Sequence, residues 1–265
     1  MPTVNANGLD LYYEVHGDGP PVLNISGTGA DLRRMPAALN PLAKSFTLLS
    51  YDQRGLGQTT GGTDADPTMA DYADDAAALL DALGWDRVPV VGTSFGGMVA
   101  LNLAVLHPQR VARLGLCCTS PGGQFASYPL HELAEGSGDD VVEARLRLYD
   151  SRFDPGAPEP IPGLGPFYDL VAEQTRAELP PEAAAGLRRQ LAARAGHDVV
   201  DALPTIDVPT LVCAGRFDAL APLANSEVLA DRIPGARLEV FDGGHLFLLQ
   251  DPAAFPAIAG FLAAG

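Results

Sequence analysis

Short apolar runs recur along this chain, and most are separated by segments in which apolar positions return every three or four residues. The runs have the length of buried strands, and the periodic segments have the spacing of amphipathic helices. Residues 68–83 show the helical period most clearly, between an Asp-Pro pair and a glycine. Near the start, residues 9–16 alternate between apolar and polar positions, which predicts a strand paired with residues 3–5 through the Asn7-Gly8 turn.

The same two patterns, short apolar runs and helical periods, predict strands and helices over most of the remaining chain. Further strands are expected at residues 22–25, 46–52, 88–91, 111–118, 210–215 and 237–241. Further helices are expected at residues 31–44, 97–107 and 222–232, and from about residue 252 onward. Strands that alternate with helices form a mainly parallel sheet with helices on both faces. The predicted fold class is therefore α/β, with a mostly parallel eight-stranded sheet.

Regularity is lost between about residues 120 and 203, a proline-rich stretch. Helical pieces are expected there near residues 126–135, 139–152, 166–178 and 181–195. We interpret this stretch as an insertion into the α/β domain. The predicted organisation is a core formed by residues 1–121 and 204–265, with a helical cap at residues 122–203. The chain shows no internal repeat.

Composition narrows the class of protein. The 265 residues are 47% hydrophobic and 19% charged, which is typical of a globular chain with a sizeable core. The net charge of −16 argues against nucleic acid or an anionic membrane surface as a partner. No apolar run reaches membrane-spanning length, and the first residues do not resemble a signal peptide. We expect a cytoplasmic protein that acts on a small molecule; whether it forms a homo-oligomer stays open.

The three cysteines, Cys117, Cys118 and Cys213, all lie in apolar runs. Neighbouring strand residues point to opposite faces, so a bridge between Cys117 and Cys118 is not expected. Their spacing matches no metal site. Buried, reduced thiols are predicted, with no metal and no cofactor.

The segment Gly92-Thr93-Ser94-Phe95-Gly96 carries the main chemical signal. It follows an apolar strand and precedes a helix-forming run, which is the context of a nucleophile elbow. Glycines are needed where the sharp turn leaves no room for a Cβ atom. The turn exposes the serine, and the N-terminus of the helix behind it favours negative charge. Ser94 is therefore the candidate nucleophile.

A serine hydroxyl needs a base within hydrogen-bond reach, and histidine is the usual one. His245 is the candidate because it lies in a loop after the last predicted strand, at the sheet edge where Ser94 is expected. Asp218, in the loop after residues 210–215, is expected to orient His245; Asp242 is the rival, but it is expected to shape the turn before His245. The other histidines, at positions 16, 107, 131 and 197, are not expected to act as the base.

An oxyanion hole needs backbone N–H groups aimed at the developing charge. Phe95, which follows the nucleophile, and Thr28, in the loop Ser26-Gly27-Thr28-Gly29, are the expected donors. Two other stretches receive structural interpretations. The loop at 52–55 is expected to make local hydrogen bonds through Asp52 and Arg54. The acidic face of the 68–83 helix, formed by Asp71, Asp74, Asp75 and Asp81, is expected to be solvated.

These motifs together resemble the α/β-hydrolase fold over nearly the whole chain. The matching stretches are residues 92–97, the loop Tyr51-Asp52-Gln53-Arg54-Gly55-Leu56-Gly57, Pro209 to Asp218, and Gly243-Gly244-His245 before Asp251-Pro252. Within that fold the chain is most similar to 3-oxoadipate enol-lactonase-like esterases and lactonases. The resemblance implies a serine hydrolase that cleaves a carboxylic ester or lactone through an acyl-enzyme, without a cofactor.

One position departs from that pattern, because many relatives carry His-Gly where this chain has Ser26-Gly27. A serine nucleophile also argues against dehalogenases and epoxide hydrolases of this fold, which carry aspartate there. Three alternatives stay open: a hydrolase of C–C bonds, a cofactor-free haloperoxidase or perhydrolase, and a non-catalytic ligand receptor. Fold likeness does not decide among them.

Overall fold

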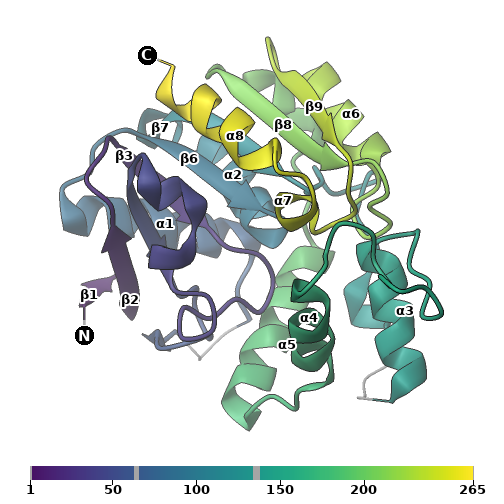
Figure 1. The fold of residues 1–265 in the computed structure, drawn as a ribbon. Helices are drawn as coiled ribbons and strands as arrows, with labels where there is room; N and C mark the ends of the chain where they lie inside the picture. Colours follow the sequence, from purple (N-terminus) through teal and green to yellow (C-terminus); the bar gives the residue numbers. More distant parts are fainter. Residues whose placement is uncertain (1, 63–65, 134–137, 265) are drawn as a thin grey trace.

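A single mixed sheet forms the centre of the molecule (Figure 1). The structure, a computed structural model, describes residues 2–62, 66–133 and 138–264. Eight strands follow the order β1-β2-β4-β3-β6-β7-β8-β9, and the short β5 pairs with β2. The strands are β1 Thr3–Ala6, β2 Leu9–His16, β3 Pro21–Ile25, β4 Thr47–Tyr51, β5 Thr60–Gly61, β6 Val88–Thr93, β7 Val111–Cys117, β8 Thr210–Gly215 and β9 Arg237–Phe241.

The expected α/β fold is confirmed. Strands β4, β3, β6, β7, β8 and β9 run parallel, whereas β2 is antiparallel to β1, β4 and β5. The eight expected strands form the continuous path, and the two-residue β5 adds a ninth within the described chain. Its partners on β2 are Leu9 and Asp10. A segment that short carries no readable alternation in the sequence.

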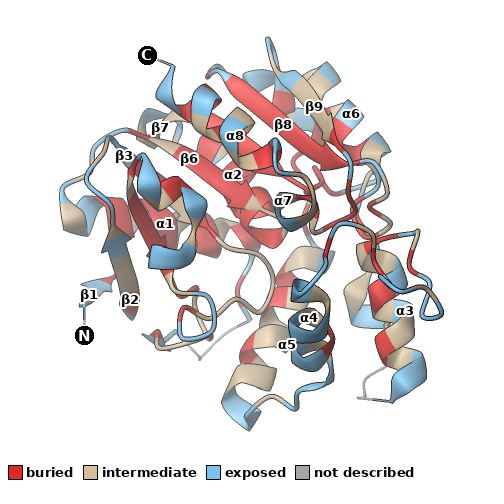
Figure 2. Cartoon of the chain, in the orientation of Figure 1, coloured by how far each residue is buried: buried red, intermediate tan, exposed pale blue. Residues whose placement is uncertain are grey.

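Helices cover both faces of the sheet. On one face lie α1 (Met69–Leu83), α2 (Phe95–Leu106) and α6 (Leu223–Arg232), which share a large apolar core with the strands. On the other face α8 (Ala254–Ala263) packs on β7 and β8 over a second apolar cluster. The central strands are therefore buried from both sides, as Figure 2 shows for β6 and β8. Two-sided burial explains why these strands read as nearly continuous apolar runs.

In the described residues, three α-helices lie between β7 and β8: α3 (Asp139–Tyr149), α4 (Phe167–Arg176) and α5 (Pro181–Ala195). We call residues 122–203 the helical insertion. These helices gather on one side of the core, beyond the ends of the strands (Figure 1). A small apolar cluster of Val142, Leu146, Phe153, Ile161 and Leu164 holds part of the insertion together. The short helix α7 (Phe247–Gln250) follows β9.

The prediction of a helix is wrong for two segments of the described chain. Residues 31–44 contain only two short 3₁₀ helices, Ala37–Leu39 and Pro41–Lys44. Pro36 and Pro41 lack an N–H group, and proline disfavours the helical region for the residue before it, so Asn40 is extended. The expected helix at 126–135 is reduced to the 3₁₀ turn Leu130–Glu132 after Pro129, and residues 134 and 135 lie outside the described chain.

The acidic face of α1 is not simply solvated, which corrects the sequence interpretation. Asp75 is only 1% exposed, and its carboxylate accepts two 2.7 Å hydrogen bonds from Arg54. Arg54 therefore spans from the loop after β4 to α1 and does not make a local contact. Burial raises the pKa of Asp75, and the nearby Arg54 guanidinium opposes that rise. Asp71 belongs to the capping box with Thr68, and Asp74 contacts His107.

Asp52 makes one local contact, as expected, and one with a distant loop. Its carboxylate accepts 2.8 Å hydrogen bonds from the amide of Gln58 in the same loop and from that of Leu32 in the loop after β3, and burial raises its pKa. The three cysteines lie buried with free thiols. In the stretches that the structure describes, no helix has both the length and the apolar character needed to cross a membrane.

Candidate active site

Ser94 lies at the turn between β6 and α2, in an unusual backbone conformation. Its φ is 55° and its ψ is −117°, a positive φ that only a few residues other than glycine adopt. The neighbouring glycines are required by space. A Cβ on Gly92 would lie 2.3 Å from the Gly96 carbonyl oxygen, and one on Gly96 would lie 2.1 Å from that of Ile25. This close approach of strand, turn and helix lifts Ser94 to the carboxyl edge of the sheet, as the motif predicts.

The structure brings Ser94, His245 and Asp218 together from three different loops. His245 Nε2 lies 3.0 Å from Ser94 Oγ, and His245 Nδ1 lies 2.8 Å from Asp218 Oδ2. A carboxylate only accepts hydrogen bonds, so Nδ1 carries the proton and Nε2 is free to accept from the serine hydroxyl. This is the arrangement in which an imidazole can act as a general base toward serine.

Asp218 is held more firmly than its rival. Its second oxygen, Oδ1, accepts 2.8 Å hydrogen bonds from the amides of Leu220 and Ala221. The side chain is 1% exposed, whereas that of Asp242 is 75% exposed and pairs with Arg152 instead. The geometry therefore places Asp218, and not Asp242, on His245.

The helical insertion contacts the His245 loop, which the sequence did not reveal. The backbone amide of His245 donates to the carbonyl of Tyr149 at 2.5 Å, and the two rings stack with centroids 6.1 Å apart. Gln250 accepts a 2.9 Å hydrogen bond from the Gly244 amide and donates at 2.8 Å to Asp150. Asp150 also pairs with Arg152, and these hydrogen bonds lower its pKa although burial alone would raise it. Residues about one hundred positions away thus fix the loop that carries the base.

The two expected oxyanion donors come from the residue after Ser94 and from a loop that approaches it. Phe95 is the first residue of α2, so its amide has no carbonyl within the helix to pair with. Thr28 belongs to the loop after β3, where Gly27 approaches Ser94: a Cβ on Gly27 would lie 3.5 Å from the Ser94 Cβ. Among the hydrogen bonds of the described residues, none engages the Thr28 amide, and Thr28 Oγ1 is buried without a partner. Within the described residues, neither amide has a hydrogen-bond partner of its own.

The remaining histidines lie away from Ser94. His107 ends α2 and contacts Asp74, while His16 and His131 lie beside glutamates at the surface. His197 is buried, with Nδ1 3.3 Å from the Asn102 amide nitrogen and Nε2 3.1 Å from the Ser120 carbonyl. Burial lowers the pKa of His197 to about 4. It is a structural residue that joins the insertion to the core.

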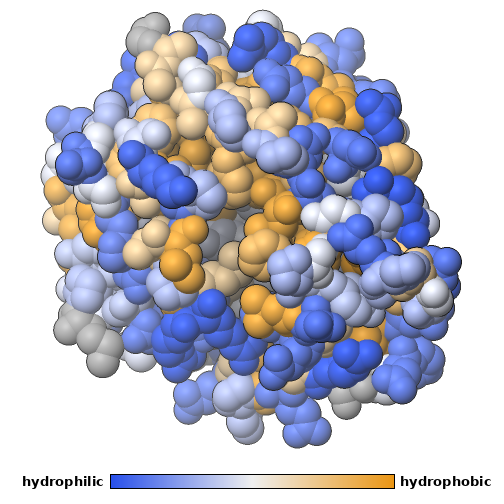
Figure 3. Space-filling model, in the orientation of Figure 1, coloured by the Kyte–Doolittle hydropathy of each residue, from blue (hydrophilic) through white to orange (hydrophobic). Residues whose placement is uncertain are grey.

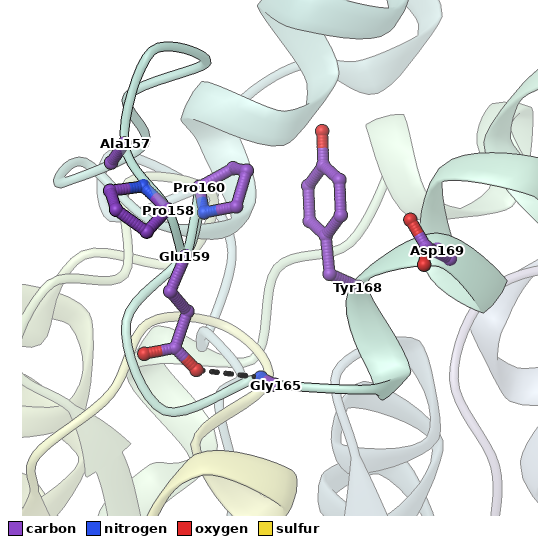
Figure 4. A pocket seen from close by; sticks show the side chains of 7 residues that line it. All are labelled: Ala157, Pro158, Glu159, Pro160, Gly165, Tyr168 and Asp169. Atoms are coloured by element: carbon purple, nitrogen blue, oxygen red, sulfur yellow. Dashed lines mark hydrogen bonds between the residues drawn. The ribbon is translucent and has the colours of Figure 1, made fainter.

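Apolar side chains surround a hollow where the insertion meets the core on the face shown in Figure 3. A separate open cavity of about 500 Å³ lies within the insertion (Figure 4). It includes none of the three residues of the Ser94 cluster, and its Glu159 accepts a 2.8 Å hydrogen bond from the Gly165 amide. The Ser94 cluster therefore lies outside this cavity. The cavity is lined by Ala157, Pro158, Glu159, Pro160, Gly165, Tyr168 and Asp169.

Comparison with known proteins gives the family. A family model described as alpha/beta hydrolase fold matches residues 20–157. The RutD protein of Variovorax paradoxus, whose name marks it as a proposed carbamate hydrolase, is 32% identical over 263 residues, covering 93% of each chain. The chain belongs to the α/β-hydrolase family.

Solved structures of other α/β hydrolases agree with this assignment. The enol-lactonase of Burkholderia xenovorans LB400 has a TM-score of 0.80 and 25% identity, over 99% of this chain and 100% of that one. A hydrolase from Pseudomonas aeruginosa PA01 has a TM-score of 0.75 and 30% identity, over 98% and 97% of the two chains. The resemblance to the α/β-hydrolase fold, with an enol-lactonase among its structural neighbours, is thereby confirmed, and a hydrolase activity is supported.

Proposed function

We propose that this α/β hydrolase cleaves a carboxylic ester or lactone of a small organic substrate through an acyl-enzyme. The observation that carries the proposal is the continuous hydrogen-bonded path from Ser94 through His245 to Asp218, with distances of 3.0 and 2.8 Å. Each member sits on a loop after a different strand, in the chain order typical of this family. The enol-lactonase neighbour supports lactones and esters as the substrate class.

The geometry suggests how each residue acts. His245 Nε2 removes the hydroxyl proton as Ser94 Oγ attacks the substrate carbonyl carbon. The amides of Thr28 and Phe95 stabilise the negative oxygen of the tetrahedral intermediate. The intermediate collapses as His245 returns the proton to the leaving alkoxide, which leaves an ester on Ser94. Water, deprotonated by His245, then releases the carboxylic acid and restores the serine. Asp218 holds the imidazole in the required tautomer throughout.

The helical insertion acts as a cap over the site in this proposal. It contacts the His245 loop through Tyr149, and apolar side chains surround the hollow between insertion and core. An apolar pocket with a few fixed polar groups is the usual setting for a small-molecule site. The cap therefore selects the acyl or alcohol group and reduces access of bulk water.

A direct test compares the wild type with Ser94→Ala and with Ser45→Ala, which alters an exposed serine. A fluorophosphonate probe is expected to add to the wild type and to Ser45→Ala but not to Ser94→Ala, as read by intact mass. Hydrolysis of p-nitrophenyl acetate should follow the same pattern, with folding of all three proteins checked by circular dichroism. Unchanged turnover by Ser94→Ala would refute the assignment.

A carbamate is the second candidate substrate, favoured by the RutD relative at 32% identity over 93% of the chain. A carbamate carbonyl forms the same tetrahedral intermediate, so the serine, base and oxyanion donors would act alike. The two candidates separate when p-nitrophenyl acetate, δ-valerolactone and a simple alkyl carbamate are compared by kcat/KM. A preference for the carbamate of more than about tenfold, equal to about 1.4 kcal/mol, would replace the ester proposal with the carbamate one.

A further inference from the structure

Two buried glutamines hold the loop that carries the Thr28 amide. Gln53, in the loop after β4, donates from Nε2 to the Ser26 carbonyl at 2.7 Å. Gln190, on α5 of the insertion, accepts at Oε1 from the Gly29 amide at 2.9 Å. The two hydrogen bonds hold the backbone at Ser26 and Gly29, on both sides of Thr28. Gln53 is 2% exposed and Gln190 is fully buried, so water does not replace either partner.

The two side chains also contact each other, which closes a ring of amides. Gln190 Nε2 donates to Gln53 Oε1 at 3.4 Å. Each glutamine thus donates once and accepts once within the ring. Rotating either amide by half a turn would bring two donors or two acceptors face to face. The ring therefore fixes the orientation of both side chains and, through them, the path of residues 26–29.

The course of α5 explains how the insertion reaches this loop. Gly186 packs against the loop after β4, where a Cβ would lie 1.8 Å from the Gly55 carbonyl oxygen. Gln190, one turn later, reaches the loop after β3. His197, two positions past the end of α5, lies with its Nε2 3.1 Å from the carbonyl of Ser120, directly after β7. Since β6 lies between β3 and β7 in the sheet, α5 crosses the region where Ser94 emerges.

We infer that Gln190 and Gln53 are positioning residues that set the Thr28 amide in the oxyanion hole, so that docking of the insertion completes the catalytic site. The inference rests on the proposed acyl transfer at Ser94. Neither glutamine touches substrate; both act through the backbone of residues 26–29. The oxyanion forms only during reaction, so the ring stabilises the transition state more than the bound substrate.

The first test replaces Gln190 with Met, which has a similar length and cannot form the ring. With p-nitrophenyl acetate, kcat is expected to fall about 10- to 100-fold, while KM changes less than about threefold. A boronic acid inhibitor, which mimics the tetrahedral intermediate, should bind less tightly by a similar factor. Arg188→Met, an exposed change on the same helix, is the matched control and should behave as the wild type. A loss expressed in KM alone, or none at all, would overturn the inference.

Gln190→Glu separates positioning from packing. A protonated carboxyl can accept from Gly29 and donate to Gln53, whereas an ionised one can only accept. Burial favours the neutral form, so the variant titrates above the usual range of a glutamate. The ratio of its kcat to that of the wild type should be highest at acid pH and fall as pH rises. A ratio that does not change with pH would contradict the ring.

Hydrogen exchange gives a measurement that does not depend on turnover. In Gln190→Met the peptide containing residues 26–29 should exchange faster than in the wild type, while peptides of β8 and β9 should not change. Equal exchange at residues 26–29 would mean that Gln190 does not hold the loop. If the wild type fails to hydrolyse the ester, the proposed function fails, and these exchange rates alone decide whether the ring holds the loop.

Discussion

Asp218 shows how strongly a single side chain of the site is constrained. Its carboxylate accepts three hydrogen bonds, from the amides of Leu220 and Ala221 and from the His245 ring. The two backbone bonds fix which oxygen faces the imidazole. An asparagine at position 218 would therefore be oriented by the amides of Leu220 and Ala221 and not by His245.

Asp218→Asn is expected to lower kcat on the order of 10⁴-fold with little change in fold. The asparagine oxygen would stay on the Leu220 and Ala221 amides, so its NH₂ group would face His245 Nδ1. Nδ1 must then accept, which puts the proton on Nε2 and prevents it from accepting from Ser94. Steady-state hydrolysis of p-nitrophenyl acetate measures the effect. Asp242→Asn is the control and should stay within about twofold; a loss below tenfold for Asp218→Asn would contradict the role assigned to it.

The sequence predicted these residues because each follows a strand, and parallel strands bring their carboxyl ends to one edge. It did not predict Tyr149, Gln190 or Gln250, which reach the same region from helices whose docking no local pattern encodes. A tyrosine or glutamine within a helix reads as an ordinary surface residue. Only the sheet order and the path of the insertion bring Tyr149 to His245 and Gln190 to Gly29.

The helices differ in how well their pattern predicted them. Helix α1 was recognised because an Asp-Pro pair before it and a glycine after Leu83 bound a clear period. Its buried ion pair was missed, since an aspartate on a polar stripe looks solvated until a partner from another element covers it. Asp75 acquires that partner from the loop after β4, where Arg54 is itself mostly buried.

Arg54→Met is expected to destabilise the protein by about 3–5 kcal/mol, because it leaves the Asp75 carboxylate buried without its cation. Urea unfolding at pH 7 measures the change. Arg33→Met removes an ion pair of Arg33 with Asp31 in which the arginine side chain is 58% exposed. This control should cost less than about 1 kcal/mol. Similar losses in the two variants would show that the burial of Asp75 does not matter.

Gly186→Ala tests whether α5 packs at a fixed position on the core. The added Cβ would lie 1.8 Å from the Gly55 carbonyl oxygen, a backbone atom that cannot rotate away, so the helix must shift. We expect faster proteolysis of the insertion and a several-fold lower kcat, while the core stays folded. In Gly196→Ala, just after the same helix, the nearest atom would be at 3.7 Å. That control should match the wild type in limited proteolysis. Equal cleavage of both variants would argue against a fixed packing position of α5 on the core.

Taken as a whole, the molecule joins a core with two apolar layers to an insertion that it holds at several points. Tyr149 and Gln250 connect it to the His245 loop, Gln190 to the loop after β3, and His197 to the segment after β7. Apart from residues 31–44 and the short β5, the core could be predicted from strand and helix periods, because its elements repeat a regular order. The helices α3, α4 and α5 of the insertion were also expected from their sequence, but their docking on the core was not, because no local pattern encodes contacts such as those of Tyr149 and Gln190.

His197 makes one of these connections sensitive to acid. The Asn102 amide nitrogen donates to Nδ1, and Nε2 donates to the Ser120 carbonyl, so the ring is neutral. A second proton on Nδ1 would face the Asn102 donor and would have no hydrogen-bond acceptor. Its pKa is lowered by burial from 6.5 to about 4, whereas in the unfolded chain it stays near the ordinary value. The unfolded state therefore binds a proton first as pH falls. Stability from this residue is present above pH 6.5 and is lost between there and about pH 4.

Between pH 7 and pH 5, His197 is expected to remove about 2 kcal/mol from the free energy of unfolding. His197→Gln keeps a donor and an acceptor at this position but does not titrate, so it should show a smaller loss over the same interval. Urea unfolding of both proteins at the two pH values isolates the difference, since all other titrating groups are shared. Equal losses would mean that His197 takes up a proton in the folded state. A larger loss in the wild type would show that the folded protein keeps His197 neutral over an interval in which the unfolded chain binds a proton.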